Sequence, residues 1–203
     1  MDANFDKELF SGKTPFAIFN RWLDDAKEKE VNDPEAIALA SVDETGMPNV
    51  RIVLLRVIEE DSFVFFSNYN SKKGSELFSS QKVAFNIHWK SLRRQIRVRG
   101  LIEKENGSVA DNYFNSRPNE SKLGAWASIQ SKELESRKIL VDRWQGFQRK
   151  YQDKVARPDF WGGFRIKPLE FEFWAEGQYR LHDRFLWKKK ENHKTWETIR
   201  LYP

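Results

Sequence analysis

The order of strand-like and helix-like segments is the feature that most constrains the fold of this chain. Short runs rich in β-branched and aromatic residues follow one another across turns, and helical patterns interrupt them in blocks. The expected strands cover 36–42, 49–58, 63–67, 82–89, 93–105, 164–174, 178–189 and 195–202. Because helices do not alternate with strands, the pattern predicts a mainly β fold, an antiparallel barrel-like sheet with peripheral helices.

Helical patterns lie before the first strand and in the middle of the chain. Thr14 can cap the first helix with Pro15 at its first position, and Ser71 can cap a short second one. The expected helices cover 14–30, 70–80, 108–117, 121–128 and 131–151, and the composition of 156–164 predicts a loop.

These segments predict one domain over residues 1–203. Within it we expect a flexible arm at 1–13, a helical insertion at 108–154 and C-terminal strands at 163–203 that complete the functional site.

Composition excludes several kinds of site. The chain has no cysteine, which excludes disulfides, thiolate metal ligands and a cysteine nucleophile. Its three histidines, His88, His182 and His193, are far apart in the sequence, so no metal site is expected. The N-terminus has no apolar leader, and no apolar run approaches the ~20 residues of a membrane helix. We therefore expect a soluble, cytoplasmic protein.

Several basic residues lie inside otherwise apolar strand patterns. Arg51 and Arg56 bracket the run "RIVLLR", and Arg180, His182 and Arg184 occupy alternate positions of "GQYRLHDRFLW". Alternate residues of a strand share a face, so these last three are expected on one side of the strand 178–189. Burying like charges together without partners is costly, so this face is expected to bind something.

Each cation also has a structural interpretation. Arg51 could pair with a neighbouring carboxylate, and Lys72 and Lys73 could simply be solvated. Arg180 and Arg184 could pair with acids nearby in the sequence, namely Asp183, Glu170 and Glu172. Taken together, however, the cations exceed the obvious local partners and are mixed with hydroxyls and a glutamine. That mixture is typical of a site for two phosphate groups and a polar heteroaromatic ring.

The motifs that carry these residues resemble those of one family. "RIVLLR", "FFSNYNSKKG", "RRQIRVRG", "YFNSRPNESKLGAWASIQS", "FWGGFR" and "EFWAEGQYRLHDRFLW" occur in the order and spacing of pyridoxine/pyridoxamine 5′-phosphate oxidases, over roughly residues 14–203. The resemblance implies an FMN-binding split β-barrel of antiparallel Greek-key type. It also implies a homodimer with FMN bound non-covalently at the subunit interface.

The activity that the resemblance implies belongs to vitamin B6 metabolism. Pyridoxine 5′-phosphate or pyridoxamine 5′-phosphate is oxidised to pyridoxal 5′-phosphate. O₂ is the final acceptor, H₂O₂ is formed, and the amine also releases ammonia. No nucleic acid, membrane or metal partner is implied.

The resemblance also implies roles for individual residues. The FMN contacts would be Arg51, Ile52, Val53, Leu54, Leu55, Arg56, Phe66, Ser67, Lys72, Lys73, Gln95, Gln130, Ser131, Trp174 and Arg184. The substrate contacts would be Asp33, Arg56, Tyr113, Arg117, Ser121, Arg180, Leu181 and His182. Arg180 and His182 would face the pyridine ring as the catalytic pair.

Two departures from the family pattern keep an alternative open. The family usually has Lys where this chain has Arg56, and residues 1–13 contain no R-x-x-Y motif. These departures favour a related flavoprotein on the same scaffold, such as a flavin reductase or an oxidase with shifted specificity. Two further alternatives are a flavin-storing module without turnover and a nucleic-acid binder, the latter suggested by "RRQIRVR". The 35 basic residues are interleaved with 30 acidic ones, however, without a basic stripe.

Overall fold

The computed structural model describes residues 8–152, 154–190 and 195–203. Nine strands in this part of the chain form one sheet in which all paired neighbours are antiparallel, in the order β2-β1-β5-β6-β7-β4-β3, with β8 on β7 and β9 on β8. The strands are β1 (Ala36–Val42), β2 (Pro48–Leu54), β3 (Val57–Ile58), β4 (Phe63–Asn68), β5 (Lys82–Trp89), β6 (Arg94–Glu105), β7 (Trp161–Ala175), β8 (Asp183–Lys189) and β9 (Trp196–Leu201). The expected antiparallel sheet with peripheral helices is confirmed.

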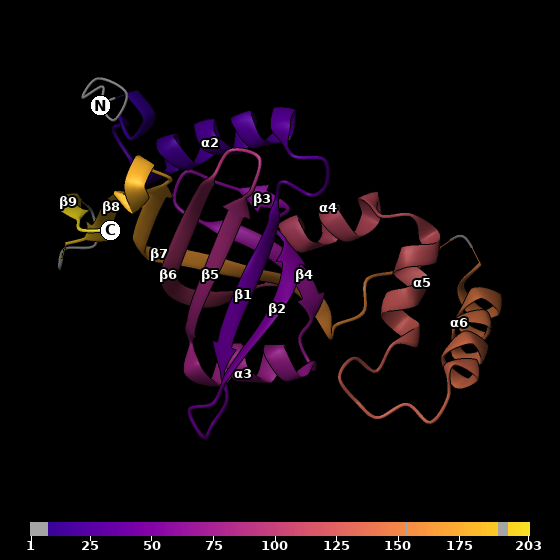
Figure 1. Cartoon of the computed structure of the whole chain (residues 1–203). Helices are drawn as coiled ribbons and strands as arrows, with labels where there is room; N and C mark the ends of the chain where they lie inside the picture. The colour runs from indigo at the N-terminus through magenta and orange to yellow at the C-terminus, as the bar shows by residue number, and fades with distance from the viewer. Residues whose placement is uncertain (1–7, 153, 191–194) are drawn as a thin grey trace.

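The helices lie around the edges of this sheet. They are α2 (Pro15–Lys29), α3 (Lys72–Ser80), α4 (Ser108–Ser116), α5 (Asn119–Ala127), α6 (Arg137–Tyr151) and the short 3₁₀ helix η1 (Gln178–Arg180). Figure 1 shows α2 across one end of the curled sheet and α3 at the other end. In the same view α4, α5 and α6 extend from one side, whereas β8 and β9 lie on the opposite side.

Helix α2 packs its aromatic face on the core. It begins as expected, because the Thr14 hydroxyl accepts a hydrogen bond from the Ala17 amide at 3.2 Å. Phe16 stacks on Phe63 with ring centroids 4.9 Å apart, and Trp22 meets Phe173 edge-on at 5.3 Å. Each such buried ring contributes about 1.5–3 kcal/mol, so this helix is a principal support of the sheet.

The described part of the expected arm also packs against α2. Arg21 donates hydrogen bonds to the carbonyl oxygens of Leu9 and Ser11 at 2.7 and 2.9 Å. The buried ring of Phe10 lies 5.4 Å from that of Trp22. Residues 8–13 are therefore joined to the body of the protein by both polar and apolar contacts.

The sheet bends where a glycine permits close approach of two strands. The β6–β7 register shifts between Arg99 and Gly100. A Cβ atom added at Gly100 would lie 2.3 Å from the Lys167 carbonyl oxygen, so only glycine fits this bulge.

The expected loop at 156–164 is wrong in its second half. Strand β7 already begins at Trp161, and Gly162 and Gly163 pair with Ser67 and Phe66 of β4. A Cβ atom at Gly162 would lie 2.0 Å from the Tyr69 hydroxyl oxygen, which explains a glycine within the strand.

The single strand expected at 178–189 is also wrong. Residues 178–180 form η1, with Tyr179 and Arg180 at φ of 57° and 65°, and β8 begins only at Asp183. A Cβ atom at Gly177 would lie 1.9 Å from the Leu181 carbonyl oxygen, so the backbone folds tightly here. Arg180, His182 and Arg184 therefore do not share one strand face.

Smaller corrections concern element ends. The expected strand 49–58 is interrupted at residues 55–56, which separate β2 from β3, and the helix expected from Ser131 begins at Arg137. His193 and residues 1–7 lie outside the described residues.

Candidate functional site

A cavity of about 350 Å³ opens between β4, α4, α5 and the start of β7. Its walls include six residues that the motifs assigned to the substrate or the flavin, together with the ring of Trp161. The lining includes Phe66, Ser67, Tyr113, Arg117, Ser121, Gln130 and Trp161. The structure thus brings together in one hollow residues from 66 to 161 in the chain.

Arg117 is the cation of this cavity, and it lacks a carboxylate partner among the described residues. Its guanidinium carbon lies 4.7 Å from the ring centre of Trp161 and 5.6 Å from that of Phe114. Its Nη1 atom is buried and makes no hydrogen bond in the described structure. Burial lowers the pKa of Arg117 because a desolvated charge is disfavoured. An anion entering the cavity would supply the missing acceptor.

The ring of Tyr113 is fixed beside this guanidinium by stacking. Its centroid lies 4.0 Å from that of Phe66, with the planes 13° apart. Tyr113 belongs to α4, whereas Ser121 lies in the first turn of α5. The break at Pro118 between these helices is what turns their hydroxyl-bearing residues toward one cavity with Arg117.

Lys73 lies at the edge of the same cavity, at the start of α3. Its ammonium donates hydrogen bonds to Ser67 Oγ at 2.7 Å, to Gln130 Oε1 at 3.1 Å and to Ser71 Oγ at 3.2 Å. None of these partners is a carboxylate. Burial, and secondarily the charge of Arg51, lowers the pKa of Lys73 to about 8. Lys73 is thus a second cation without a compensating negative charge among these partners.

Arg51, by contrast, is already paired. Its Nη2 lies 3.2 Å from Glu76 Oε2, and its Nη1 donates to the Ser41 hydroxyl at 2.5 Å. Glu76 is only 5% exposed, and it also accepts a hydrogen bond from Asn49 Nδ2 at 2.6 Å. Lys72 lies 4.0 Å from the same carboxylate and faces a neighbouring hollow of about 460 Å³ that includes Ser131.

Sequence reasoning missed Glu76 and Trp161. The first was recognisable as an acid on α3 four residues after Lys72, on a face that also contains buried Leu77. The second fell in a segment expected to be a loop, so its wall position could not be inferred.

A second group of expected site residues lies on β6, β7 and β8. Gln95 pairs with Trp174, and Trp174 pairs with Arg184, so these three form a row on one face of the sheet. The His182 ring lies 4.7 Å from Trp174, and its Nδ1 accepts a hydrogen bond from the Gly177 amide at 3.2 Å.

Arg184 is paired as the structural interpretation expected. Its Nη2 lies 2.8 Å from Oε1 of the buried Glu172, which also pairs with Arg97. Arg184 donates in addition to the Tyr202 carbonyl oxygen at 2.9 Å.

The remaining expected residues lie at the surface or in the strand β2. Arg180 is exposed at the end of η1 and Leu181 directly after it, and Asp33 is exposed at φ 43° between α2 and β1. Arg56 is exposed between β2 and β3 and makes no ion pair with a described residue. The burial of residues 52–55 varies along the chain. Ile52 is exposed, Val53 and Leu54 are half-buried, and Leu55 is buried.

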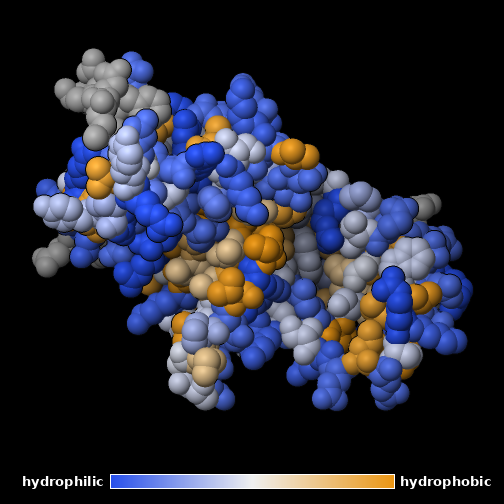
Figure 2. Space-filling view, in the orientation of Figure 1, coloured by the Kyte–Doolittle hydropathy of each residue, from blue (hydrophilic) through white to orange (hydrophobic). Residues whose placement is uncertain are grey.

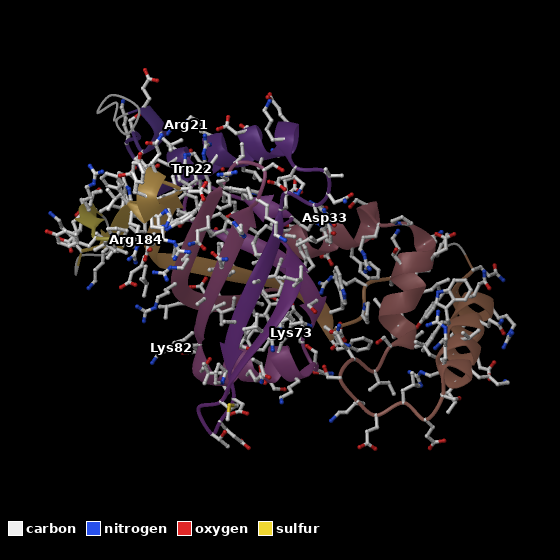
Figure 3. All side chains as sticks on the ribbon, viewed as in Figure 1. Arg21, Trp22, Asp33, Lys73, Lys82 and Arg184 are labelled. Atoms are coloured by element: carbon white, nitrogen blue, oxygen red, sulfur yellow. The ribbon has the colours of Figure 1, made fainter. Side chains whose placement is uncertain are left out.

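The two groups are separated within one chain. Trp161 and Trp174 lie near opposite ends of β7, a strand of 15 residues that would span up to about 50 Å if fully extended. Figure 3 shows Lys73 and Arg184 on different sides of the sheet. The two groups therefore lie apart along β7 in one chain.

An apolar face lies on the sheet surface between the two groups. Val50 and Ile52 of β2 are 66% and 65% exposed. They adjoin a hollow of about 550 Å³ lined in part by Ala38, Ala84 and Leu186. Figure 2 shows hydrophobic residues gathered in the middle of this view, over the strands β1 and β2 of Figure 1. Asn86 Oδ1, which is buried beside this hollow, makes no hydrogen bond in the described structure.

Comparison with known proteins decides which family this architecture represents. Residues 23–150, more than half of the chain, match the family model described as pyridoxamine 5′-phosphate oxidase. Residues 161–203 match the pyridoxine 5′-phosphate oxidase C-terminal dimerisation region.

The chain belongs to the pyridoxine/pyridoxamine 5′-phosphate oxidase family. It is 54% identical over 199 residues to the oxidase of that name from Ruegeria sp. (strain TM1040), covering 98% of this chain and 99% of that protein. It is 48% identical over 202 residues to the oxidase of that name from Brucella canis, covering 99% of this chain and 100% of that protein. The family name makes the protein an oxidoreductase, as the motifs predicted.

Solved structures confirm the split-barrel fold of this oxidase family. PhzG from Burkholderia lata 383, in complex with tetrahydrophenazine-1-carboxylic acid, matches with a TM-score of 0.90 at 27% identity, covering 100% of this chain and 98% of PhzG. An FMN-binding, pyridoxamine 5′-phosphate oxidase-related protein from Nostoc punctiforme matches with a TM-score of 0.75 at 13% identity, covering 95% of this chain and all of that one. The second match shows the fold alone.

The dimerisation region of the oxidase family contains the whole second group apart from Gln95. Trp174, Arg180, His182 and Arg184 all lie within 161–203. Among the described residues, no helix is long and apolar enough to span a membrane, and no cluster of side chains could hold a metal ion.

Proposed function

We propose that this protein oxidises pyridoxine 5′-phosphate or pyridoxamine 5′-phosphate to pyridoxal 5′-phosphate. Bound FMN would be the cofactor and O₂ the final acceptor, with release of H₂O₂ and, from the amine, of ammonia. The observation that carries this proposal is the half-buried Arg117, which lines the cavity, has no carboxylate partner among the described residues, and has a buried Nη1 without a hydrogen bond.

Arg117, Tyr113 and Ser121 would bind the phosphate group of the substrate. A guanidinium and two hydroxyl groups provide several donors to phosphate oxygens, and charge-assisted hydrogen bonds of this kind contribute about 1.5–3 kcal/mol each. Because the phosphate does not react, this binding energy can be used to orient the distant C4′ carbon. Arg56, exposed near this region in place of the usual lysine, would add a further cation.

The residues around Lys73 fit the phosphate ester of FMN. Lys73, Ser67 and Gln130 form one hydrogen-bonded cluster, and Arg51 and Lys72 lie beside Glu76 in the next layer. When bound, FMN would supply an acceptor for the hydride and its two electrons. The chain would position FMN through Lys73, Ser67 and Gln130, whose side chains are already held in place by hydrogen bonds to one another.

A second copy of the chain would complete the site. The second group does not line the cavity of its own chain, yet the resemblance assigns both groups to the same ligands. The apolar face with Val50 and Ile52 is suited to association, because exposed apolar surface of this kind is stabilised by burial. In the homodimer, Gln95, Trp174 and Arg184 of one subunit would contact FMN bound mainly by the other.

Arg180 and His182, which belong to the second group's part of the chain, would contact the pyridine ring of the substrate. Arg180 is exposed at a positive φ, and non-glycine residues in that region persist where surrounding structure imposes the conformation. Its exposed guanidinium would hold the ring in place while C4′ loses its hydride to the acceptor. His182, whose Nδ1 already accepts a hydrogen bond from Gly177, would have its other ring nitrogen for the substrate.

The test is an absorbance experiment with the purified holoenzyme in the absence of air. Addition of pyridoxamine 5′-phosphate should bleach the flavin band near its visible maximum, and readmitted air should restore it with formation of pyridoxal 5′-phosphate. Pyridoxamine without the phosphate is the matched control and should bleach far more slowly at the same concentration. A protein that binds no FMN, or whose flavin is reduced by NADH but not by pyridoxamine 5′-phosphate, would overturn the proposal.

A further inference from the structure

We propose that Trp161 is a positioning residue that holds Arg117 in place and leaves its N–H donors available for the substrate phosphate. The inference deepens the proposed function and rests on it, because it concerns how the same cavity recognises a phosphate group. The juxtaposition that carries it is a guanidinium 4.7 Å from an indole ring, with a buried Nη1 that lacks an acceptor.

Trp161 is itself held in place by several elements. Its backbone pairs with Asn68 of β4, and its carbonyl oxygen accepts a hydrogen bond from Arg157 Nη1 at 2.8 Å. Phe114 of α4 meets its ring edge-on, with centroids 5.0 Å apart. The indole is therefore a fixed surface, and the cation that rests on it has a defined position.

Other arginines of this region are bound in a different way. Arg157 pairs with Asp111 at 2.7 Å, and Arg165 pairs with both Glu59 and Glu105. A carboxylate partner neutralises a guanidinium and accepts its N–H groups, so little is left for a ligand. The aromatic partner of Arg117 is thus a specific feature of the cavity wall.

An aromatic face attracts a cation without accepting its in-plane N–H donors. The interaction contributes about 0.5–2 kcal/mol, the larger value applying to desolvated sites. Trp161 can therefore offset part of the cost of burying Arg117 and still leave a full positive charge in the cavity. The donor that finds no acceptor in the described structure, Nη1, would then be satisfied by a phosphate oxygen.

The same indole continues a stack of rings along the cavity wall. Its plane is within 11° of that of Phe66 and within 5° of that of Tyr113, with centroids 5.7 and 6.2 Å apart. Trp161 thus contacts Arg117 directly and is aligned with Tyr113, the other residue proposed to bind the phosphate. A loss of the indole should act on phosphate recognition before it acts on the flavin.

The experiment uses the FMN-saturated protein and the variants Trp161→Leu and Trp161→Phe. Leucine removes the aromatic face and keeps an apolar side chain, so we expect the KM for pyridoxine 5′-phosphate to rise about tenfold with kcat within about twofold of wild type. Phenylalanine keeps a ring with a weaker cation affinity and should raise KM only about threefold. Calorimetric titration with inorganic phosphate should show the same order of affinities.

Two controls separate positioning from a general structural effect. Phe147→Leu, which removes the ring beneath Arg143 on α6 and outside the cavity, should change neither KM nor phosphate affinity. In an Arg117→Ala background Trp161→Phe should have no further effect on phosphate affinity, because the indole acts through the guanidinium. This second comparison stays informative even if Trp161→Leu does not fold.

The outcomes are distinguishable. Unchanged phosphate affinity in Trp161→Phe and in a folded Trp161→Leu would overturn the inference, as would a Trp161→Phe effect of equal size with and without Arg117. If the wild-type protein oxidises neither phosphorylated substrate, the proposed function fails. The phosphate titrations would then still decide whether Trp161 supports anion binding at Arg117.

Discussion

Arg51 and Arg117 lie on neighbouring parts of the same site, yet their charges are compensated in opposite ways. Arg51 is paired with the buried carboxylate of Glu76 and with the hydroxyl of Ser41. Arg117 rests on the ring of Trp161, and its buried Nη1 has no hydrogen-bond acceptor among the described residues. The first arrangement is complete within one chain, whereas the second is complete only with an added anion.

The partner of a buried cation distinguishes a structural role from a ligand-binding one. A buried carboxylate beside an arginine satisfies the charge locally, and removing either partner leaves a buried charge unpaired. An aromatic partner leaves the charge in place, so removing the arginine takes away ligand affinity and costs little in folding. Substitutions around Arg51 should therefore change mainly the free energy of unfolding, and substitutions of Arg117 mainly the affinity for the ligand.

The largest effect is expected from Glu76→Ala. It would leave Arg51 without its carboxylate and should lower the free energy of unfolding by about 3 kcal/mol. For a chain of this size that corresponds to a decrease in Tm of about 10 °C, measurable by thermal unfolding of the FMN-free protein. Glu76→Gln keeps one acceptor oxygen for Arg51 and Ser41 but loses the second acceptor, so it should lower the free energy of unfolding less than Glu76→Ala does. A Tm within a degree of wild type in Glu76→Ala would show that the pair is not structural.

Arg117→Ala should show the reverse pattern. We expect the KM for pyridoxine 5′-phosphate to rise about 100-fold, because charge-assisted hydrogen bonds to the phosphate are lost. The Tm should be no lower than that of wild type, since an unpaired buried charge is removed. Steady-state kinetics and thermal unfolding of the same preparation check both. An unchanged KM would remove Arg117 from the substrate site.

A smaller effect is expected from pH on the Lys73 cluster. Burial lowers the pKa of Lys73 to about 8, so its ammonium is present below that pH and is lost as the pH rises through it. Because an anion binds the charged form, the Kd for FMN should rise about tenfold between pH 7 and pH 9.

Flavin fluorescence quenching at the two pH values measures this change. In Lys73→Met the Kd for FMN should be higher than that of wild type at pH 7. It should change little between pH 7 and pH 9, because no ammonium titrates. An equal pH response in wild type and Lys73→Met would assign the titration to another group.

The smallest effect is expected at an exposed ion pair. Lys138 lies 2.6 Å from Asp142 on α6, and its side chain is 80% exposed. Lys138→Ala should change the free energy of unfolding by less than about 0.5 kcal/mol, because water screens such pairs. Urea unfolding of Lys138→Ala and Glu76→Ala, measured in parallel, compares the loss of unfolding free energy at an exposed ion pair with the loss at a buried one.

Local patterns predicted most elements of the fold. The helix α2 begins at its Thr14 cap, and β1 and β5 span the residues expected from their apolar alternation. The errors lie where glycines and tight turns override the local pattern. Gly162 allows β7 to pass Tyr69, and Gly177 allows the backbone to fold into η1 instead of continuing as a strand.

Part of the candidate site was also predictable. The motifs named Tyr113, Arg117 and Ser121 as one set, and the structure brings them to one cavity. The partners of the cations were not predictable. Glu76 is 25 residues from Arg51, and Trp161 is distant from Arg117 in the chain, so no local pattern connects them.

Short-range periodicity, turn chemistry and motif spacing were enough to predict the antiparallel sheet, the family and the charged and aromatic residues of the candidate site, because all of them are present in the unfolded chain. Which cations are neutralised, which remain available to a ligand, and that the two groups of expected site residues lie apart in one chain became evident from the folded molecule. Charge compensation depends on distance and burial, and these arise when remote segments pack together.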